Sequence, residues 1–211
     1  PASDRTILVQ FGDTISKNLH MQVFSFTKYL IDYPNDAIIN IHPAYNSVMV
    51  SLDGKATLEN VSDYLLSVMD AVNDAESILS RTVEVPVIYG GKNGPDLDRV
   101  SAHTGLSQDE VIQRHFQGNY VVYFIGFSIG FPYFGGLDQS IATPRLDSPR
   151  KSVPKGSIGI AGDQTGIYPL SSPGGWNLIG RTELEIFNID DPKQSALKMG
   201  DRVKFFPAKR E

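Results

Sequence analysis

The sequence predicts an α+β protein with two domains, residues 1–88 and 89–211, and three observations lead to this prediction. The first half of the chain carries two segments in which apolar residues recur every three or four positions, between short runs typical of strands. The second half lacks that spacing over residues 126–181, which hold eleven of the 19 glycines and six of the 13 prolines. A glycine-rich stretch, residues 89–95, separates the two patterns and is the expected boundary.

The first domain is expected to begin with a strand, a helix and a pair of strands. Residues 7–11 form a short apolar run typical of a strand. A helix follows, and its buried face is formed by Ile15, Leu19, Val23, Phe26 and Leu30. Pro34 ends this helix because proline disfavours the helical conformation of the residue before it. Residues 37–41 and 47–52 are then expected to be two strands joined by a short connection.

A second helix and a last strand complete the first domain. Thr57 is the expected N-cap of the helix. One face of this helix carries Leu58, Val61, Leu65, Val68 and Val72. In residues 82–89, Val83, Val85 and Val87 alternate with other residues, which indicates a strand. The resulting βαββαβ order is that of a ferredoxin-like domain, whose final strand lies at a sheet edge where Pro86 is tolerated.

The second domain is expected to open with two short helices, residues 96–104 and 107–117. Ser107 and Glu110 form a capping box at the start of the second helix. The pair resembles a DNA-binding helix-turn-helix, but its second helix has no basic face and the chain carries a net charge of −5. Nucleic-acid binding is therefore not expected. A strand, residues 120–125, leads into the glycine-rich region, which we interpret as strands and structured loops because it also holds large aromatic side chains.

Composition excludes several other classes of protein. The chain has no cysteine, so thiolate chemistry and disulfide pairing are excluded. A zinc site is not expected without cysteine or a paired-histidine motif, and we assign no metal ligands. No apolar run reaches the roughly 20 residues of a membrane-spanning helix, and the first residues do not resemble a signal peptide. The expected location is the cytoplasm, without a membrane partner.

Residues 126–130 match the G-x-S-x-G nucleophile elbow of some hydrolases. That elbow requires a helix directly after the serine, and the proline- and glycine-containing residues 131–136 cannot begin one. It also requires a histidine later in the chain, whereas the last one here is His115. Ser128 is therefore not expected to be a nucleophile. The glycines of residues 156–162 match neither of the two common nucleotide-binding glycine motifs.

Polar residues that lie among these glycines and aromatic residues are the candidates for a site. Arginine offers a fork for carboxylate or phosphate groups, and aspartate can accept a proton or bind magnesium. The alternative is that the charged residues form salt bridges that tether loops. His103 is the histidine placed nearest this region, and packing of its helix is the alternative role. The candidates are His103, Asp138, Thr143, Arg145, Arg150, Gln164, Thr165, Tyr168, Trp176 and Arg181.

Short motifs in the same region resemble the allophanate hydrolase subunit 1 / KipI family. They are residues 130–138 (GFPYFGGLD), 142–145 (ATPR), 149–150 (PR), 153–157 (VPKGS), 159–162 (GIAG), 164–169 (QTGIYP), 172–176 (SPGGW) and 179–182 (IGRT). The resemblance covers nearly the whole chain and is close from residue 82 onward.

This resemblance implies a cyclophilin-like β-barrel in the second domain and an enzyme subunit that is inactive alone. Family members share an active site with a subunit 2 (PxpC) partner, and a third protein, PxpA, completes an ATP-dependent hydrolase of 5-oxoproline. The implied activity is hydrolysis of a lactam amide, with ATP and Mg²⁺ acting in the assembled complex. Two alternatives are a KipI-like inhibitor of a sensor histidine kinase and a subunit of an allophanate- or urea-processing enzyme.

Residue type suggests how the candidates would divide the work. Asp138 would handle a metal or a proton, Arg145 would hold an anionic group, and Gln164 and Tyr168 would orient the amide. These four are the expected catalytic residues. Substrate or phosphate binding is assigned to Arg150, Arg181, Thr143, Thr165, His103 and Trp176. In the inhibitor alternative, Phe131, Phe134 and Trp176 would instead be exposed anchors.

Overall fold

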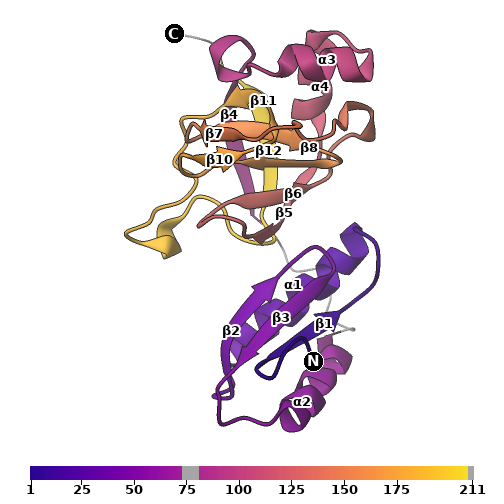
Figure 1. Cartoon of the computed structure of the whole chain (residues 1–211), viewed down its shortest axis with the longest axis vertical. Coiled ribbons are helices and arrows are strands. Elements are labelled where there is room, and N and C mark those ends of the chain that lie inside the picture. Colours follow the sequence, from indigo (N-terminus) through magenta and orange to yellow (C-terminus); the bar gives the residue numbers. More distant parts are fainter. Residues whose placement is uncertain (73–80, 209–211) are drawn as a thin grey trace. The chain divides into compact units, whose positions relative to one another are not determined.

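The computed structural model describes residues 1–72 and 81–208 and has an α+β architecture that includes a closed β-barrel (Figure 1). The chain divides into two compact units, Pro1–Leu79 and Ser80–Glu211. No helix in the described part of the chain combines the length and the hydrophobicity that a membrane span requires.

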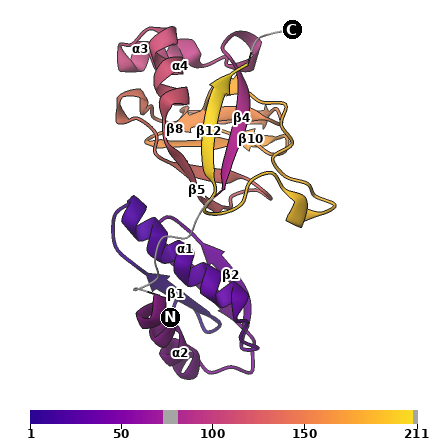
Figure 2. The same cartoon turned by 180° about the vertical axis from the view of Figure 1, so that it is seen from behind.

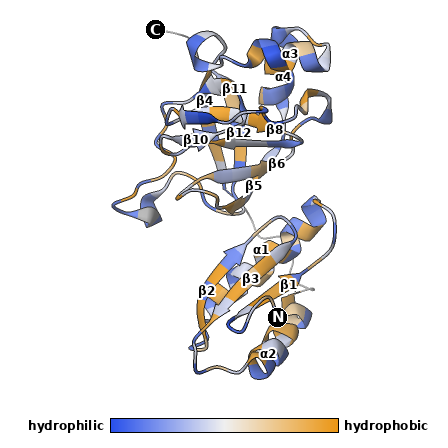
Figure 3. Ribbon diagram, viewed as in Figure 1, coloured by the Kyte–Doolittle hydropathy of each residue, from blue (hydrophilic) through white to orange (hydrophobic). Residues whose placement is uncertain are grey.

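The first unit contains a three-stranded antiparallel sheet and two helices. Its strands β1 (Thr6–Gln10), β2 (Ile38–Pro43) and β3 (Ser47–Leu52) lie in the order β1-β3-β2. Helix α1 (Lys17–Asp32) lies behind the sheet in Figure 1 and in front of it in Figure 2, so it covers one face. Helix α2 is Leu58–Val72. The orange stretches along the strands in Figure 3 mark the apolar residues of this sheet.

Both predicted helical faces are confirmed, with a small correction at the start of α1. Ser16 caps this helix by accepting a hydrogen bond from the Leu19 backbone N–H at 3.2 Å. Ile15 therefore precedes the helix, and its side chain is exposed. The residues that the prediction shares with the buried faces are Val23, Phe26, Leu30, Val61, Leu65, Val68 and Val72.

The last strand of the predicted ferredoxin-like domain was assigned to the wrong sheet. Strand β4 (Thr82–Tyr89) forms as expected, but it lies in the barrel between β11 (Asn177–Arg181) and β12 (Arg202–Pro207). Val85 and Val87 are fully buried in the barrel core, and that burial decides its place. Alternating valines predict a strand but carry no information about its sheet. The ferredoxin-like order is therefore not completed within the described part of the first unit.

Pro86 is accommodated inside the barrel by a local gap in strand pairing. The Val87 carbonyl accepts a hydrogen bond from Ala208 on the β12 side, so the neighbouring Pro86 nitrogen faces the other side of β4. On that side β11 pairs only with Ile88 and Tyr89. No ladder hydrogen bond is lost at Pro86, for the reason that makes edge strands tolerate proline.

The second unit is built on a closed barrel with the strand order β11-β4-β12-β5-β6-β9-β8. The further barrel strands are β5 (Tyr120–Ile125), β6 (Pro132–Gly135), β8 (Ser157–Ala161) and β9 (Gln164–Ile167). A separate pair, β7 (Arg150–Val153) and β10 (Ser172–Gly174), forms a two-stranded sheet. This architecture fits the barrel that the family resemblance implies.

Helices α3 (Leu97–Thr104) and α4 (Gln108–Gln117) lie together at one end of the barrel in both views (Figures 1 and 2). The predicted capping box between Ser107 and Glu110 is present at the start of α4. Short 3-10 turns occur at η1 (Gly91–Asn93), η2 (Gln139–Ile141) and η3 (Pro192–Gln194). The glycine-rich residues 89–95 therefore belong to the barrel unit, where they include the end of β4 and η1.

The barrel unit holds two groups of buried apolar residues. The larger group fills the barrel and includes Tyr120, Phe134 and Phe205. The smaller group contains Phe131, Val153, Ala161, Tyr168, Trp176 and Leu178, with Tyr133 packed against it. This smaller group, which we call the aromatic cluster, supports the candidate site.

Candidate functional site

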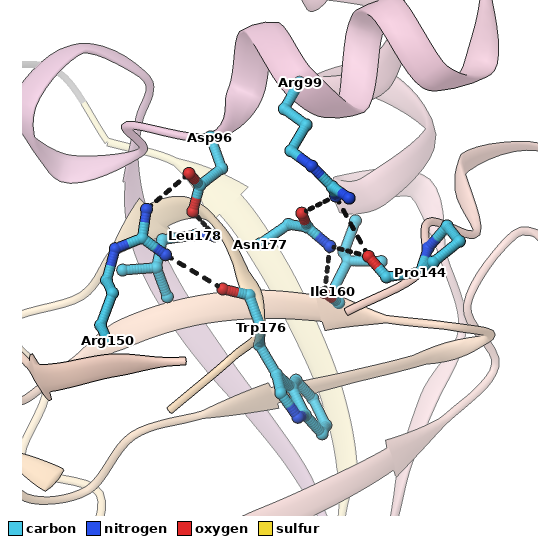
Figure 4. Close-up of polar contacts among 8 residues, drawn as sticks. All are labelled: Asp96, Arg99, Pro144, Arg150, Ile160, Trp176, Asn177 and Leu178. Carbon is cyan, nitrogen blue, oxygen red and sulfur yellow. Dashed lines mark hydrogen bonds and ion pairs between the residues drawn. The ribbon is translucent and has the colours of Figure 1, made fainter. Parts of the chain in front are cut away.

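Asp96 ties the start of α3 to strand β11 (Figure 4). Its Oδ2 accepts a hydrogen bond from the Leu178 backbone N–H at 2.7 Å, and its Oδ1 forms an ion pair with Arg150 Nη2 at 2.6 Å. The Arg150 guanidinium also donates to the Trp176 carbonyl at 3.5 Å. Arg150, a predicted phosphate ligand, is thus held by an internal carboxylate, and its predicted role in binding is not tested by this arrangement.

Gly94 makes the approach of Asp96 to β11 possible. A Cβ atom at position 94 would lie 2.1 Å from the Ile179 carbonyl oxygen, far inside contact distance, so only glycine fits. The close approach lets the Asp96 backbone N–H donate to the Leu178 carbonyl at 2.9 Å. The carboxylate of the same residue then reaches the Leu178 N–H.

Asn177 is a second buried tie in the same place (Figure 4). Its Oδ1 accepts a hydrogen bond from Arg99 of α3, and its Nδ2 donates to the carbonyls of Pro144 and Ile160, each at 2.9 Å. Asn177 is completely buried, so these bonds satisfy polar atoms that water cannot reach. We call the Asp96–Arg150 and Arg99–Asn177 contacts together the paired region, because its charged groups have internal partners.

Arg145 lies in a different environment, over the aromatic cluster. Its guanidinium carbon is 5.9 Å from the centre of the Trp176 ring, a cation–π arrangement. Two backbone contacts fix the loop around it: Thr143 pairs with Gly162, and the Leu146 N–H donates to the Gly175 carbonyl at 2.8 Å. The residue is exposed, and within residues 1–72 and 81–208 it makes no ion pair or hydrogen bond.

Two tyrosines of the aromatic cluster lie within the electrostatic reach of Arg145. Burial raises the pKa of Tyr168 to about 12, although a hydrogen bond with the Trp176 backbone and the charges of Arg145 and Arg150 act in the opposite direction. Burial also raises the pKa of Tyr133, which the charge of Arg145 opposes. Both phenols are therefore protonated at neutral pH and can donate hydrogen bonds.

Phe131 and Gly174 hold these rings in position. The Phe131 ring is in edge contact with Tyr168 and Trp176, with centroid distances of 5.0 and 5.4 Å. A Cβ atom at Gly174 would lie 2.2 Å from the Tyr168 hydroxyl oxygen, so the backbone of β10 passes directly beside that hydroxyl. The cluster thus consists of an exposed cation, a half-buried phenol (Tyr133), and a phenol and an indole that are buried beneath them. The exposed guanidinium of Arg145 is the group that can bind a carboxylate or phosphate.

The structure therefore brings three predicted site residues together, namely Arg145, Tyr168 and Trp176. Asp138 lies elsewhere, at the start of η2, where its carboxylate accepts hydrogen bonds from the hydroxyl and the backbone N–H of Ser140. These bonds are the main cause of its lowered pKa, with a smaller contribution from Arg114. Asp138 is consequently a carboxylate at neutral pH and a poor proton donor.

The remaining predicted residues do not converge on one point in the structure. Arg181 is exposed and donates through Nε to the Lys155 carbonyl at 2.9 Å. Gln164 begins β9, where it pairs with Ala161. His103 is exposed near the end of α3. Thr143 is buried, and its hydroxyl donates to the Ile141 carbonyl at 3.2 Å.

Thr165 belongs to a buried polar chain inside the barrel. Its hydroxyl donates to the Gly159 carbonyl at 2.9 Å, so its oxygen can accept from His115 Nε2, 3.2 Å away. The Tyr89 hydroxyl, 2.7 Å from Nδ1 of the same histidine, then donates to that nitrogen. Burial lowers the pKa of His115 to about 3, which keeps the ring neutral. These hydrogen bonds satisfy polar groups in the barrel core and involve no residue of the aromatic cluster.

Sequence reasoning missed several residues that matter in the two regions. Tyr133 lies in one of the motifs that resemble the family but is not among the predicted site residues, although an aromatic hydroxyl in a glycine-rich run is a usable signal. Asp96 and Asn177 carry no local signal. The partners of Asp96 lie 54 and 82 positions away in the chain, and those of Asn177 lie between 17 and 78 positions away. Long-range pairs of this kind cannot be read from one sequence.

The inhibitor alternative required exposed aromatic anchors, and this expectation is wrong for the residues named. Phe131, Phe134 and Trp176 are all buried, because they pack inside the aromatic cluster or the barrel core. The described part of the chain also contains no group of three or more His, Asp or Glu side chains that could hold a metal ion.

Comparisons with known proteins give a consistent result. The carboxyltransferase domain family, subdomain C and D, matches residues 1–197. The 5-oxoprolinase B subunit of Bacillus subtilis (strain 168) is 40% identical over 213 residues, covering 96% of this chain and 89% of that protein. A protein of the same name from Escherichia coli O157:H7 is 38% identical over 206 residues, covering 98% and 94%.

Among solved structures, TTHA0988 superposes with a TM-score of 0.85 at 32% identity. The match covers 98% of this chain but 40% of TTHA0988, so this chain spans well under half the length of that protein. The same fold thus occurs within a longer polypeptide.

Proposed function

Because the chain belongs to the carboxyltransferase domain family, subdomain C and D, and is related to two 5-oxoprolinase subunits, we propose that it is a subunit of an ATP-dependent 5-oxoprolinase. The reaction is hydrolysis of the lactam amide of 5-oxoproline to glutamate. The observation that carries this proposal is the 40% identity that extends over 96% of the chain and 89% of the relative. A match of this length includes both units and the aromatic cluster, so it does not rest on one shared motif.

The chemistry of the aromatic cluster supports this proposal. 5-Oxoproline carries a carboxylate next to a planar, unactivated lactam. Arg145 would hold the carboxylate or a phosphoryl group, because its guanidinium is exposed and has no internal anion among the described residues. The protonated Tyr133, the less buried of the two phenols, would donate a hydrogen bond to the oxygen on which charge develops when the amide carbonyl is attacked. The buried Tyr168 would support the rings beneath the substrate.

ATP would supply the phosphoryl group that turns the lactam oxygen into a leaving group. Arg145 fits the role of neutralising that group. The described residues offer no complete magnesium site, because they contain no cluster of three or more Asp, Glu or His side chains that could hold a metal ion. Since Mg²⁺ often keeps its waters and binds through one or two carboxylates plus substrate phosphates, its remaining ligands would come from ATP or another subunit.

The chain would contribute one part of the catalytic site, and partners would contribute the rest. We propose a subunit 2 (PxpC) homologue and a PxpA-like protein as those partners. The exposed Arg145 supports this division, because a charge without an internal anion in the described part of the chain is available to a substrate or to another polypeptide.

Reconstitution tests the proposal. The chain is combined with the subunit 2 and PxpA homologues encoded in the same genome, and glutamate release from 5-oxoproline is measured with and without ATP. We expect ATP-dependent release that requires this chain. Release of ammonia from allophanate, with no release of glutamate from 5-oxoproline, would instead identify the urea-processing alternative and overturn the proposal.

A further inference from the structure

The loop between β5 and β6 presents two large apolar side chains to solvent. Phe127 is 70% exposed and Ile129 is 63% exposed. The loop is nevertheless well defined, because the Gly126 N–H donates to the Phe131 carbonyl at 3.0 Å and the Phe131 N–H donates to the Ser128 carbonyl at 3.1 Å. A turn closed by two backbone hydrogen bonds holds both side chains in place instead of letting them collapse onto the barrel.

The loop has an unfavourable conformation in the isolated chain. Phe127 has a φ of +63°. Among the described residues other than glycine, it alone has a positive φ. This region of φ is disfavoured for a bulky side chain and indicates strain that the surroundings must impose. Ser128 lies between the two apolar residues, and its buried hydroxyl has no hydrogen-bond partner among the described residues. Strain, a lone buried hydroxyl and exposed apolar groups thus coincide in three consecutive residues.

We propose that Phe127 and Ile129 dock this chain into an apolar pocket on the second subunit of the complex, an inference that rests on the proposed function. Exposed aromatic and aliphatic groups on a rigid turn have the properties of interface anchors, because they lose little conformational freedom on binding. Burial of these two side chains against the partner would then offset the cost of the strained loop backbone.

The comparison with TTHA0988 identifies the kind of partner. This chain corresponds to 40% of that protein, so there the same fold is joined to a longer stretch of polypeptide. The related proteins that match this chain along most of their length are named as single subunits of a 5-oxoprolinase, which implies at least one other subunit. In the related 5-oxoprolinase subunits, of which this chain covers 89 and 94%, the polypeptide that TTHA0988 carries within its own chain would be a separate subunit, which needs a surface to bind.

The position of the loop connects the docking surface with the candidate site. The Phe127 ring is in edge contact with Phe131, with 5.7 Å between centroids. Phe131 contacts Tyr168 and Trp176 of the aromatic cluster on its other sides. A subunit that covers Phe127 would therefore lie one side chain away from the rings that support Arg145, and it could complete the site there.

Binding measurements with matched variants test this proposal. The purified subunit 2 homologue is titrated into the full chain, into Phe127→Gly and into Ile129→Ser. Glycine keeps the left-handed backbone without strain, so the isolated Phe127→Gly chain should melt no lower than the unmodified one. We expect each variant to weaken Kd by about 30-fold, as an interface hot spot does. Ile39→Ser is the control, because Ile39 is equally exposed at 68% but lies in the first unit.

The outcomes separate this inference from the proposed function. Unchanged Kd values for both loop variants, in a complex that hydrolyses 5-oxoproline, would overturn the docking surface and leave the function standing. Weakened binding by the variants, in a complex that does not hydrolyse 5-oxoproline, would support the surface and contradict the function. If the unmodified chain does not bind the subunit 2 homologue at all, the docking proposal is wrong.

Discussion

The paired region and the aromatic cluster lie in the same barrel unit, yet the arginines of the first have internal polar partners and the arginine of the second has none among the described residues. Arg150 and Arg99 have internal partners in Asp96 and Asn177, which are both buried. Arg145 instead lies exposed over the Trp176 ring without an anionic partner in the described part of the chain. A charge that is paired with buried partners maintains the fold, whereas an unpaired charge over an indole ring is available for a ligand.

This difference between the two regions cannot be deduced from residue type, because the paired and the unpaired arginines are both among the predicted site residues. Variants of the two regions test this difference, because those in the paired region should affect stability and those at Arg145 should affect activity. The expected effects on the free energy of unfolding decrease from Asp96 to Arg145.

Asp96→Ala should have the largest effect. The change leaves the buried Leu178 N–H without an acceptor and Arg150 without its carboxylate. We expect a loss of about 3 kcal/mol, at the low end for a broken buried pair because Arg150 is partly exposed. Urea unfolding followed by the fluorescence of the single tryptophan measures it. Asp147→Ala, an exposed carboxylate, is the control, and an equal loss there would show that the paired region has no special importance.

Lowering the pH should have the second-largest effect on the free energy of unfolding, through the buried ring of His115. His115 has a pKa of about 3 in the folded chain because of burial, against about 6.5 when unfolded. The unfolded state therefore binds more protons below pH 6.5, so stability falls as pH falls. Between pH 6.5 and 4.5 the loss should be about 2–3 kcal/mol, or roughly 1.4 kcal/mol per pH unit.

The same experiment on His115→Gln provides the check, because tryptophan fluorescence reports the unit that contains Trp176. The slope of stability against pH should become shallower in this variant, whatever its absolute stability. His20 in the first unit, whose pKa burial lowers to about 4, would still titrate in a probe of that unit. An unchanged slope for the barrel in His115→Gln would contradict the assignment of a neutral buried ring.

Gly174→Ala should have an intermediate effect on the aromatic cluster. The added Cβ would lie 2.2 Å from the Tyr168 hydroxyl oxygen and must displace either the ring or the β10 backbone. Overpacking of this kind costs about 1–3 kcal/mol. Gly175→Ala is a close control, since its Cβ would meet no atom nearer than 3.5 Å. Comparable melting temperatures for the two variants would mean that Tyr168 is not held where the structure places it.

Much of the fold followed from the sequence because local patterns encode local structure. Helical spacing identified both faces in the first unit, and Ser107 with Glu110 marked the start of α4. The sequence predicts β4 in the wrong sheet, because alternation along a strand shows that one face is buried but does not show which strands it pairs with. Pairing with β11 and β12 depends on residues about 100 positions away in the chain.

The candidate site was predictable in its residue types but not in its geometry. Of the ten candidates, Arg145, Tyr168 and Trp176 lie together, and all three are in short turn-bounded segments with aromatic neighbours. Asp138 is predicted as a site residue because of its carboxylate. In the structure, hydrogen bonds from Ser140 hold that carboxylate at the start of η2. Arg150 looked identical to Arg145 in sequence, and only the long-range contact with Asp96 separates them.

A comparison of Arg145→Ala with Arg150→Ala decides whether the exposed arginine takes part in the reaction while the paired one maintains the fold. Each variant is assembled with the subunit 2 and PxpA homologues, and both the urea unfolding of the free chain and glutamate release by the complex are measured. Arg145→Ala should change stability by less than about 1 kcal/mol, the size of an exposed cation–π contact, and slow glutamate release at least about 100-fold. Arg150→Ala should lower stability and slow the reaction far less. A complex with Arg145→Ala that works at the unmodified rate would contradict the account.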